Sequence, residues 1–324
     1  MKNKIIGLFG ASLLAAGIFA GYGKVEAAEA DAVKISASDA NVNWFQVVDE
    51  IQGFSKELGL DVEWVENLGS GPEIIAAIAG GSVDVGKIGD FPIVTNYGGG
   101  ETPVFEVLSF FTRNTDSVVF VKADSEIESI EDLKGKKIGT QIGTGSQYQL
   151  VNTLDKAGLT LEDVELFNVD SGSWAAAFAS DEIDAVCILE DVTIGNEEIG
   201  DIRVLDRCDL ALNSIIGNTE WAAANPEATA KTIILLSECI DYASANVEDT
   251  ISAVAEVYPE ISAERLSFSI NAVTNTALSG DWDTAINRYT ELKDFALDAG
   301  TIQNDFDVES VYDPQFVELA NTLK

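Results

Sequence analysis

Two stretches of the chain combine a serine–glycine turn with acidic residues at similar spacing, and the chemistry open to them is ligand binding. The first reads SGPEIIAAIAGGSVDVGKIGD over residues 70–90, and the second reads SGSWAAAFASDEIDAVCILED over residues 171–191. In each, an Ala-rich segment follows the turn, and an acid ends a short apolar run. A glycine-containing turn before a helix offers free N–H groups to an anion, whereas a carboxylate at a strand end attracts a cation.

Three turns of this kind precede predicted helices, at residues 68–71, 143–146 and 170–173. The alternative for each is ordinary capping of its helix by a serine or threonine side chain. None of them matches a P-loop or a GxGxxG dinucleotide turn. Because ligands of open α/β sheets bind where such turns meet, all three turns are candidates for ligand contact in one cleft.

Acidic residues and tryptophans are the second group of candidates. Asp90 and the pair Glu190–Asp191 follow apolar, strand-like runs, where they could face a ligand or cap the next helix. Trp44 and Trp174 begin predicted helices, where an aromatic ring could close over a ligand or hold a cation over its face. Core packing is the alternative for both tryptophans.

The composition excludes several classes of function. The chain has no histidine, so Ser-His-Asp and Cys-His catalysis are excluded and zinc loses its commonest nitrogen ligand. We therefore predict a protein that is not an enzyme and has no cofactor or metal site, with a carboxylate-only hydrolase as the alternative. A formal net charge of −36 excludes nucleic acid as a partner and is typical of proteins that work in high salt.

Residues 1–27 are predicted to be a cleavable signal peptide. Lys2 and Lys4 precede the apolar run IIGLFGASLLAAGIFAG, and small residues follow at a cleavage site; a single membrane anchor is the alternative. Because no cysteine stands near this site, we expect a periplasmic protein without a lipid anchor. We also expect it to be a monomer. Cys187 and Cys239 are expected to be buried thiols, with a Cys187–Cys208 bridge as the alternative.

Hydrophobic periodicity predicts two β-α-β-α-β units, over residues 32–90 and 136–191. Such alternation is typical of an α/β fold, here with two lobes, each a sheet flanked by helices. The apolar runs 117–121 and 211–216 are suited to crossing between the lobes, and the helices after Pro226 are expected to cover the first lobe. The predicted lobes are residues 28–119 together with 214–324, and an inserted lobe at 120–213.

Four segments resemble the solute-binding proteins of ABC importers: SGPEIIAAIAGGSVDVGKIGDFP, SIEDLKGKKIGTQIGTGSQYQLVNTLDKAGL, IDAVCILED and WAAANPE. The branch they resemble binds aliphatic sulfonates, taurine, nitrate or a thiamine pyrimidine precursor. The resemblance implies a type II periplasmic-binding-protein fold, with two lobes joined by a two-strand hinge. It also implies a small-molecule ligand, transient docking to an ABC permease at the inner membrane, and a cleft lined by Ser70, Gly71, Asp90, Thr144, Gly145, Ser146 and the region near Asp191.

Two departures from the family pattern bear on the ligand. Gln147 stands where a histidine is common, and Glu190-Asp191-Val192 stands where Trp-Asp-Pro is common. The second change argues against simple alkanesulfonates and nitrate, and the missing histidine excludes the related pyrimidine synthases. Because donor-rich turns and acids are predicted for one cleft, we expect a taurine-like sulfonate. A cationic or amine solute (a pyrimidine precursor, polyamine or quaternary amine) is the alternative ligand, and a sensory role is an alternative to transport.

Overall fold

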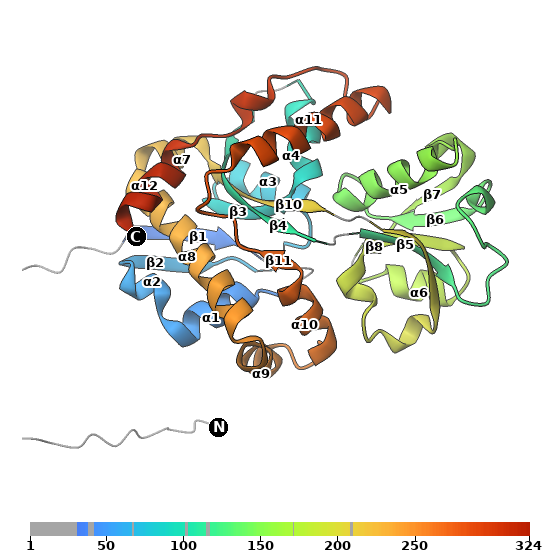
Figure 1. Cartoon of the computed structure of the whole chain (residues 1–324), viewed down its shortest axis with the longest axis horizontal. Helices are drawn as coiled ribbons and strands as arrows, with labels where there is room; N and C mark the ends of the chain where they lie inside the picture. The colour runs from blue at the N-terminus through green and yellow to red at the C-terminus, as the bar shows by residue number, and fades with distance from the viewer. Residues whose placement is uncertain are drawn as a thin grey trace, which may run out of the picture. The chain divides into compact units, whose positions relative to one another are not determined.

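The structure, a computed structural model, describes residues 31–37, 42–66, 68–100, 103–114, 117–170, 172–207 and 210–324. Two sheets organise these residues (Figure 1). The strand order is β11-β4-β10-β3-β1-β2 in the first sheet and β7-β6-β8-β5-β9 in the second. The predicted signal peptide and Cys208 lie outside the described residues.

The first lobe consists of the first sheet and the helices packed on it, and its elements come from both ends of the described chain. Its strands are β1 (Asp31–Ser36), β2 (Leu60–Trp64), β3 (Val85–Gly89), β4 (Phe105–Arg113), β10 (Ala211–Asn218) and β11 (Val273–Thr274). Its helices are α1 (Trp44–Gln52), α2 (Phe54–Glu57), α3 (Gly71–Ala79), α4 (Asp90–Tyr97), α7 (Thr219–Ala224), α8 (Pro226–Ala245), α9 (Val247–Val257), α10 (Ala263–Asn271), α11 (Trp282–Asp298) and α12 (Gln315–Leu323), with the 3-10 helix η5 (Val308–Val311).

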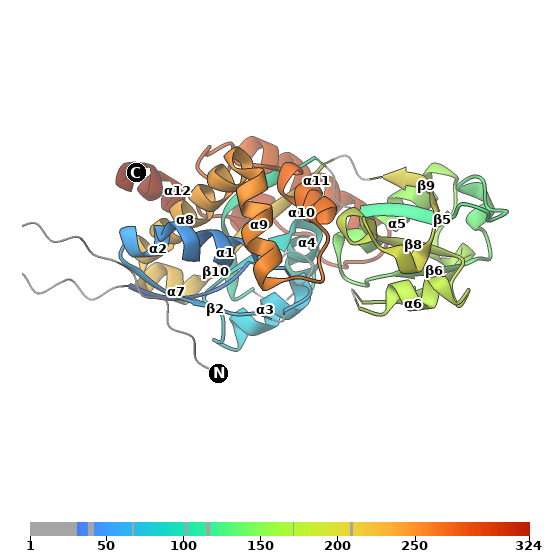
Figure 2. The same cartoon turned by 90° about the horizontal axis from the view of Figure 1, so that it is seen from below.

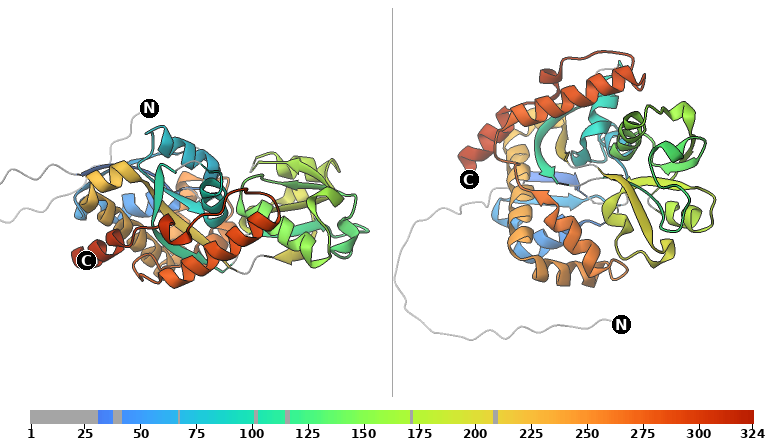
Figure 3. Two further views of the ribbon diagram at one scale, coloured as in Figure 1. Left: turned by 90° about the horizontal axis from the view of Figure 1, so that it is seen from above. Right: turned by 45° about the vertical axis from the view of Figure 1, so that its right-hand side comes forward.

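The second lobe is built from the middle of the chain. Its strands are β5 (Ser117–Lys122), β6 (Lys137–Thr140), β7 (Glu165–Asn168), β8 (Ala185–Leu189) and β9 (Ile202–Arg207). Its helices are α5 (Gly145–Lys156) and α6 (Trp174–Ala179), with the 3-10 helices η1 (Glu131–Leu133), η2 (Leu161–Asp163), η3 (Glu190–Thr193) and η4 (Glu197–Ile199). Figures 2 and 3 show both sheets from further directions.

Apolar side chains cover both faces of each sheet, as expected for doubly wound α/β folds. In the first lobe, one core packs under α1, α8, α10 and α12, and a second packs under α3, α4 and α11. In the second lobe, α6 covers one face and α5 the other. The helices after Pro226 therefore cover the first lobe, as predicted.

The two predicted β-α-β-α-β units correspond strand for strand. β1 pairs in parallel with β2 and β3, and β6 pairs in parallel with β7 and β8. In each unit the aspartate before the third strand binds the first strand. Asp84 Oδ2 accepts a hydrogen bond from Lys34 N at 2.9 Å, and Asp184 Oδ2 accepts one from Lys137 N at 2.8 Å. These carboxylates tie neighbouring strands together and do not line the pocket described below.

The two apolar runs expected to cross between the lobes do not cross. β5 pairs along its length with β8 and β9, and β10 pairs with β3 and β4. The chain passes to the second sheet between Arg113 and Ser117 and returns between Arg207 and Ala211. The boundaries proposed after residues 119 and 213 thus fall inside strands, because an apolar run predicts a buried strand but not the sheet that it joins.

Every helix among the described residues is too short or too polar to span a membrane.

A half-buried glutamate on β4 predicts a pH-dependent stability. Burial, and then the neighbouring Asp313, raise the pKa of Glu106 from its usual 4.5 to about 7. The folded form thus keeps a proton that the unfolded chain releases, so this residue's contribution to the free energy of unfolding decreases from about pH 4.5 to about pH 7. We expect the free energy of unfolding of Glu106→Gln, measured in urea, to increase relative to that of the wild type as the pH rises through this window. Above about pH 7 the difference between the two proteins should stay constant. Parallel profiles for the two proteins would contradict this.

Candidate functional site

A pocket of about 100 Å³ is lined by residues of both lobes and is called the interlobe pocket below. The first lobe supplies the turn before α3, the start of α4 and the ends of β3, β4 and β10. The second lobe supplies the turn before α5 and the end of β8. This is the carboxyl edge of the parallel strands, where open α/β sheets bind ligands. The lining residues are Leu68, Gly69, Ser70, Gly71, Ile74, Lys87, Ile88, Gly89, Asp90, Pro92, Arg113, Gln141, Thr144, Gly145, Ser146, Leu189, Ala211 and Asn213.

The turn before α3 forms one wall and is held by its own capping contacts. Ser70 Oγ accepts a hydrogen bond from Glu73 N at 3.4 Å, and the Glu73 carboxylate accepts one from Gly69 N at 2.8 Å. A Cβ atom at Gly71 would lie 2.7 Å from Cγ of Pro92. Glycine at position 71 therefore lets the turn pack directly on α4 and brings its backbone to the pocket.

The turn before α5 forms the facing wall. Thr144 Oγ1 accepts a hydrogen bond from Ser146 N at 3.2 Å and donates one to Gln141 O at 2.7 Å. The buried hydroxyls of Ser146 and Ser117 lie 3.0 Å apart. Both turns thus cap their helices and also line the pocket.

Two basic side chains from the first sheet are buried at the interlobe pocket. Lys87 on β3 and Arg113 at the end of β4 are each 4% exposed, and Lys87 Nζ lies 3.4 Å from Asn213 Oδ1. Two such cations beside the N-termini of α3 and α5 make this pocket suited to an anion.

Asp90 also lines the interlobe pocket, but its carboxylate has a cationic partner. It is 2% exposed, and Oδ2 accepts hydrogen bonds from Arg288 Nε at 2.8 Å and from Leu212 N at 3.1 Å. The Arg288 guanidinium lies 5.0 Å from the ring centroid of Tyr148, a cation–π contact. The acid that was expected to attract a cationic ligand group is therefore already ion-paired.

Tyr148 connects α5 of the second lobe to helices of the first. Its ring lies 5.5 Å from that of Phe91 and, edge-on, 4.8 Å from that of Phe295. Its hydroxyl donates a hydrogen bond to Glu291 at 3.2 Å. Because burial raises the pKa of Tyr148 to about 12, the hydroxyl stays protonated and remains a donor at neutral pH.

A known family model matches most of the described chain. The family described as NMT1/THI5 like matches residues 44–250, more than half of the sequence. The chain belongs to the NMT1/THI5-like family. The family resemblance drawn from the sequence motifs is thereby confirmed.

Two relatives of this NMT1/THI5-like chain have names that state binding. A Brucella abortus (strain 2308) protein, named only as a binding protein, is 31% identical over 219 residues, which are 63% of this chain and 64% of that one. An Escherichia coli (strain K12) protein named for binding aliphatic sulfonates is 31% identical over 150 residues, 46% of each chain. The chain thus aligns with less than two thirds of the length of either relative.

Solved structures share the fold of the NMT1/THI5-like chain. One of them is the alkanesulfonate-binding protein SsuA from Xanthomonas axonopodis pv. citri, solved with MOPS bound. It superimposes with a TM-score of 0.75 at 18% identity, and the match covers 88% of this chain and 99% of that one. The desulfurization enzyme DszB superimposes with a TM-score of 0.66 at 15% identity, and the match covers 90% of this chain and 99% of that one. The predicted periplasmic-binding-protein fold is confirmed, and binding proteins and an enzyme both use it.

The structure places Glu190 and Asp191 of the NMT1/THI5-like chain outside the interlobe pocket, although Leu189 lines it. Arg207 Nε lies 3.0 Å from both carboxylate oxygens of Glu190. Asp191 is buried against α10, where Oδ2 accepts a hydrogen bond from Ser269 Oγ at 3.1 Å. These placements differ from the expected ligand contact, because tertiary packing supplied each acid with a protein partner.

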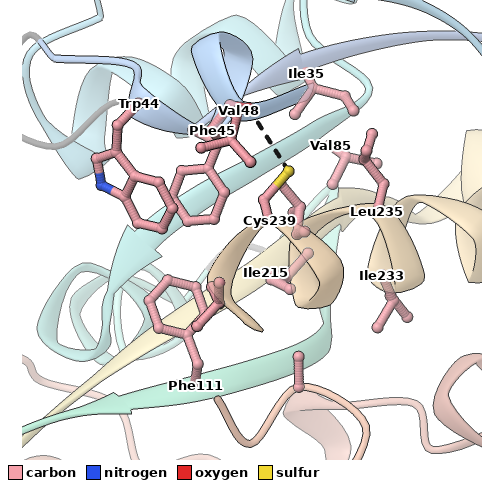
Figure 4. Packing of buried hydrophobic residues seen from close by; sticks show 14 of the residues in the cluster. Ile35, Trp44, Phe45, Val48, Val85, Phe111, Ile215, Ile233, Leu235 and Cys239 are labelled. Carbon is pink, nitrogen blue, oxygen red and sulfur yellow. Dashed lines mark hydrogen bonds between the residues drawn. The ribbon is translucent and has the colours of Figure 1, made fainter. Parts of the chain in front are cut away.

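Both predicted tryptophans lie in hydrophobic cores and are absent from the pocket lining. Trp44 stacks on Phe45, with ring centroids 3.8 Å apart, in the core under α1 and α8 (Figure 4). Trp174 packs edge-on against Phe120 in the second lobe. The placement again differs from the expected ligand contact and agrees with the core-packing alternative. Cys187 and Cys239 are also buried, as expected.

The third predicted turn, before α6, does not line the interlobe pocket either. The Asp170 carboxylate accepts hydrogen bonds from Gly172 N at 2.8 Å and Ser173 N at 2.9 Å, which lower its pKa. Ser171 lies outside the described residues. The N–H groups that were expected to hold a ligand are therefore bound by the turn's own carboxylate.

Lys87 and Arg113 are the charged residues of the pocket lining that the sequence motifs did not predict. Lys87 lies within the strand sequence VGKIG, and Arg113 ends the strand sequence FEVLSFFTR. The available signal was a basic residue in an otherwise apolar strand, because lysine and arginine are rarely found fully buried. Among the described residues, no group of three or more histidines, cysteines or acids could hold a metal ion.

Proposed function

We propose that this chain is an exported solute-binding protein that captures a small organic sulfonate in the interlobe pocket and delivers it to an ABC permease. The observation that carries the proposal is the burial of Lys87 and Arg113 beside the N-termini of α3 and α5. A sulfonate accepts charge-assisted hydrogen bonds from such cations and from helix N–H groups. The E. coli relative named for aliphatic sulfonates supports the same class of ligand.

The pocket volume supports a small ligand. Sites for drug-sized molecules occupy about 300–1,000 Å³, whereas the interlobe pocket measures about 100 Å³. A two-carbon sulfonate, including the taurine-like ligand predicted from the sequence, matches this pocket better than an aryl or long-chain sulfonate. Closure of the lobes on such a ligand would provide the signal that a permease recognises.

Binding without catalysis is part of the proposal. With no histidine in the chain, the usual proton-transfer group at neutral pH is absent. Asp90, the acid that lines the pocket, is ion-paired with Arg288. This pairing supports a role for Asp90 in recognition.

A cation or amine binder is the second candidate, because Asp90 does line the interlobe pocket. In that case the ligand's ammonium would share the Asp90 carboxylate with Arg288. Lys87 and Arg113 would then repel it. The anion is the better supported ligand.

Thermal unfolding with added ligands tests the proposal. We expect ethanesulfonate or taurine to raise the melting temperature, and choline or a polyamine to leave it unchanged, in both low salt and about 1 M salt. A ligand at 100 times its dissociation constant stabilises the folded state by about 2.7 kcal/mol, which gives a clear shift. Stabilisation by the cations alone would assign the site to amines. Turnover of a bound sulfonate would show that the protein is an enzyme.

A further inference from the structure

We propose that the Asp90–Arg288 ion pair sets the charge selectivity of the interlobe pocket, so that it prefers sulfonates without an ammonium group to the zwitterion taurine. This inference rests on the proposed function and deepens it by naming the ligand subclass. It departs from the taurine-like ligand that the sequence predicted.

The ion pair is fixed from several sides. The Arg288 side chain is 10% exposed and that of Asp90 is 3% exposed, and their Nε and Oδ2 atoms lie 2.8 Å apart. Leu212 N donates to the same Oδ2 atom, which holds the carboxylate against the start of β10. The guanidinium is also placed over the Tyr148 ring and lies 3.5 Å from Glu291. Neither partner can leave this geometry without losing several other contacts.

A buried guanidinium partner compensates the negative charge of a carboxylate, so the carboxylate attracts a ligand cation only weakly. At short range and low exposure, the attraction between Asp90 and Arg288 is weakly screened by water. A ligand ammonium that entered the pocket would lose its hydration and gain only a shared carboxylate in return. It would also approach Lys87 and Arg113, whose charges repel it. A methyl group at the same place would meet neither penalty. A hydroxyl would lose less hydration free energy than an ammonium and would not be repelled by the cations.

The subclass follows from comparing ligands of one size. Taurine, isethionate and ethanesulfonate carry the same two-carbon sulfonate and differ at the far end, with an ammonium, a hydroxyl and a methyl group. Their sulfonates would make the same contacts with the cations and helix N-termini. Any difference in affinity therefore reports how the pocket treats the far end. We expect isethionate and ethanesulfonate to bind at least about tenfold more tightly than taurine, a factor that corresponds to about 1.4 kcal/mol.

Isothermal titration calorimetry with these three ligands tests the inference on the wild type and on variants of the pair. Arg288→Gln leaves the Asp90 charge without its guanidinium, so the preference for isethionate over taurine should fall at least about tenfold. Asp90→Asn leaves Arg288 as an additional cation, so the same preference should rise. The two variants should change the ratio of the taurine and isethionate dissociation constants in opposite directions. A general loss of structure would not produce such opposite changes.

Control variants separate charge from folding. Arg288→Lys keeps the positive charge and should retain the wild-type preference. Lys156→Gln removes a comparable cation, which is paired with Asp206 at 2.6 Å and does not line the interlobe pocket, and should also retain it. Circular dichroism would verify that each variant is folded. If Arg288→Gln does not fold, the inference is tested by the titration of Asp90→Asn and by the ratio of the taurine and isethionate dissociation constants of the wild type.

The outcomes separate this inference from the proposed function. If the wild type binds none of the three sulfonates, the proposed function fails and this inference fails with it. If it binds sulfonates but prefers taurine, or if the ratio is the same in the wild type, Arg288→Gln and Asp90→Asn, the proposed function stands and the role of the ion pair is refuted.

Discussion

Replacing Lys87 with methionine is expected to weaken sulfonate binding by about 30-fold or more, because removing one partner from a buried charge pair costs about 2–5 kcal/mol. Methionine keeps most of the length and volume of the lysine side chain, so β3 should retain its pairing with β10. The measurement is calorimetric titration of the best-binding two-carbon sulfonate against the variant and the wild type. Arg113→Gln, on the neighbouring wall, should act in the same direction.

The control for this experiment is Lys137→Met. Lys137 begins β6, at the opposite end of that strand from the pocket, and is exposed. This change removes the same charge from the chain and should leave the sulfonate affinity unchanged. If Lys87→Met and Arg113→Gln both bind the sulfonate as well as Lys137→Met does, the two buried cations do not form the anion site, and the proposed function loses its main support.

Replacing Trp44 with alanine is expected to cost about 3–5 kcal/mol of the free energy of unfolding, as is typical for truncating a large buried aromatic side chain. The ring stacks on Phe45 and belongs to the core that also contains Phe111, Ile215 and Cys239 (Figure 4). Urea unfolding monitored by circular dichroism gives the loss. The half-buried Trp64 on β2 provides a comparison, and its change to alanine should cost less.

Ligand affinity decides between core packing and ligand contact for Trp44. The milder variant Trp44→Phe should remain folded and bind the sulfonate with the wild-type dissociation constant, since Trp44 does not line the interlobe pocket. A large loss of affinity in this variant, with stability retained, would restore the ligand contact that was predicted from the sequence.

Local sequence patterns predicted the walls of the pocket because each wall is a local structure. Ser70 and Thr144 end their turns as helix N-caps within a few residues of the strands that precede them. The carboxyl ends of parallel strands lie on one edge of each sheet, so two copies of one unit predict two facing turns. The same reasoning failed for the turn before α6, where Asp170 binds the free N–H groups itself.

The charge balance of the pocket could not be predicted from local patterns. Asp90 is paired with a residue 198 positions further along the chain, and Lys87 contacts Asn213, which lies 126 positions away. Glu190 and Asp191 have the same sequence signature as Asp90, an acid after a buried strand. In the tertiary structure Asp90 lies at the pocket, whereas Glu190 contacts Arg207 and Asp191 contacts α10.

The sequence by itself determined the α/β fold, the paired β-α-β-α-β units and the turns that line the pocket, because hydrophobic periodicity, capping and strand polarity depend on residues close together in the chain. The family was recognised from the resemblance of four continuous sequence segments. The tertiary structure alone decided which charged side chains face the pocket and which are paired. An ion pair between distant residues depends on the approach of separately folded elements, and its strength depends on burial, which no local pattern contains.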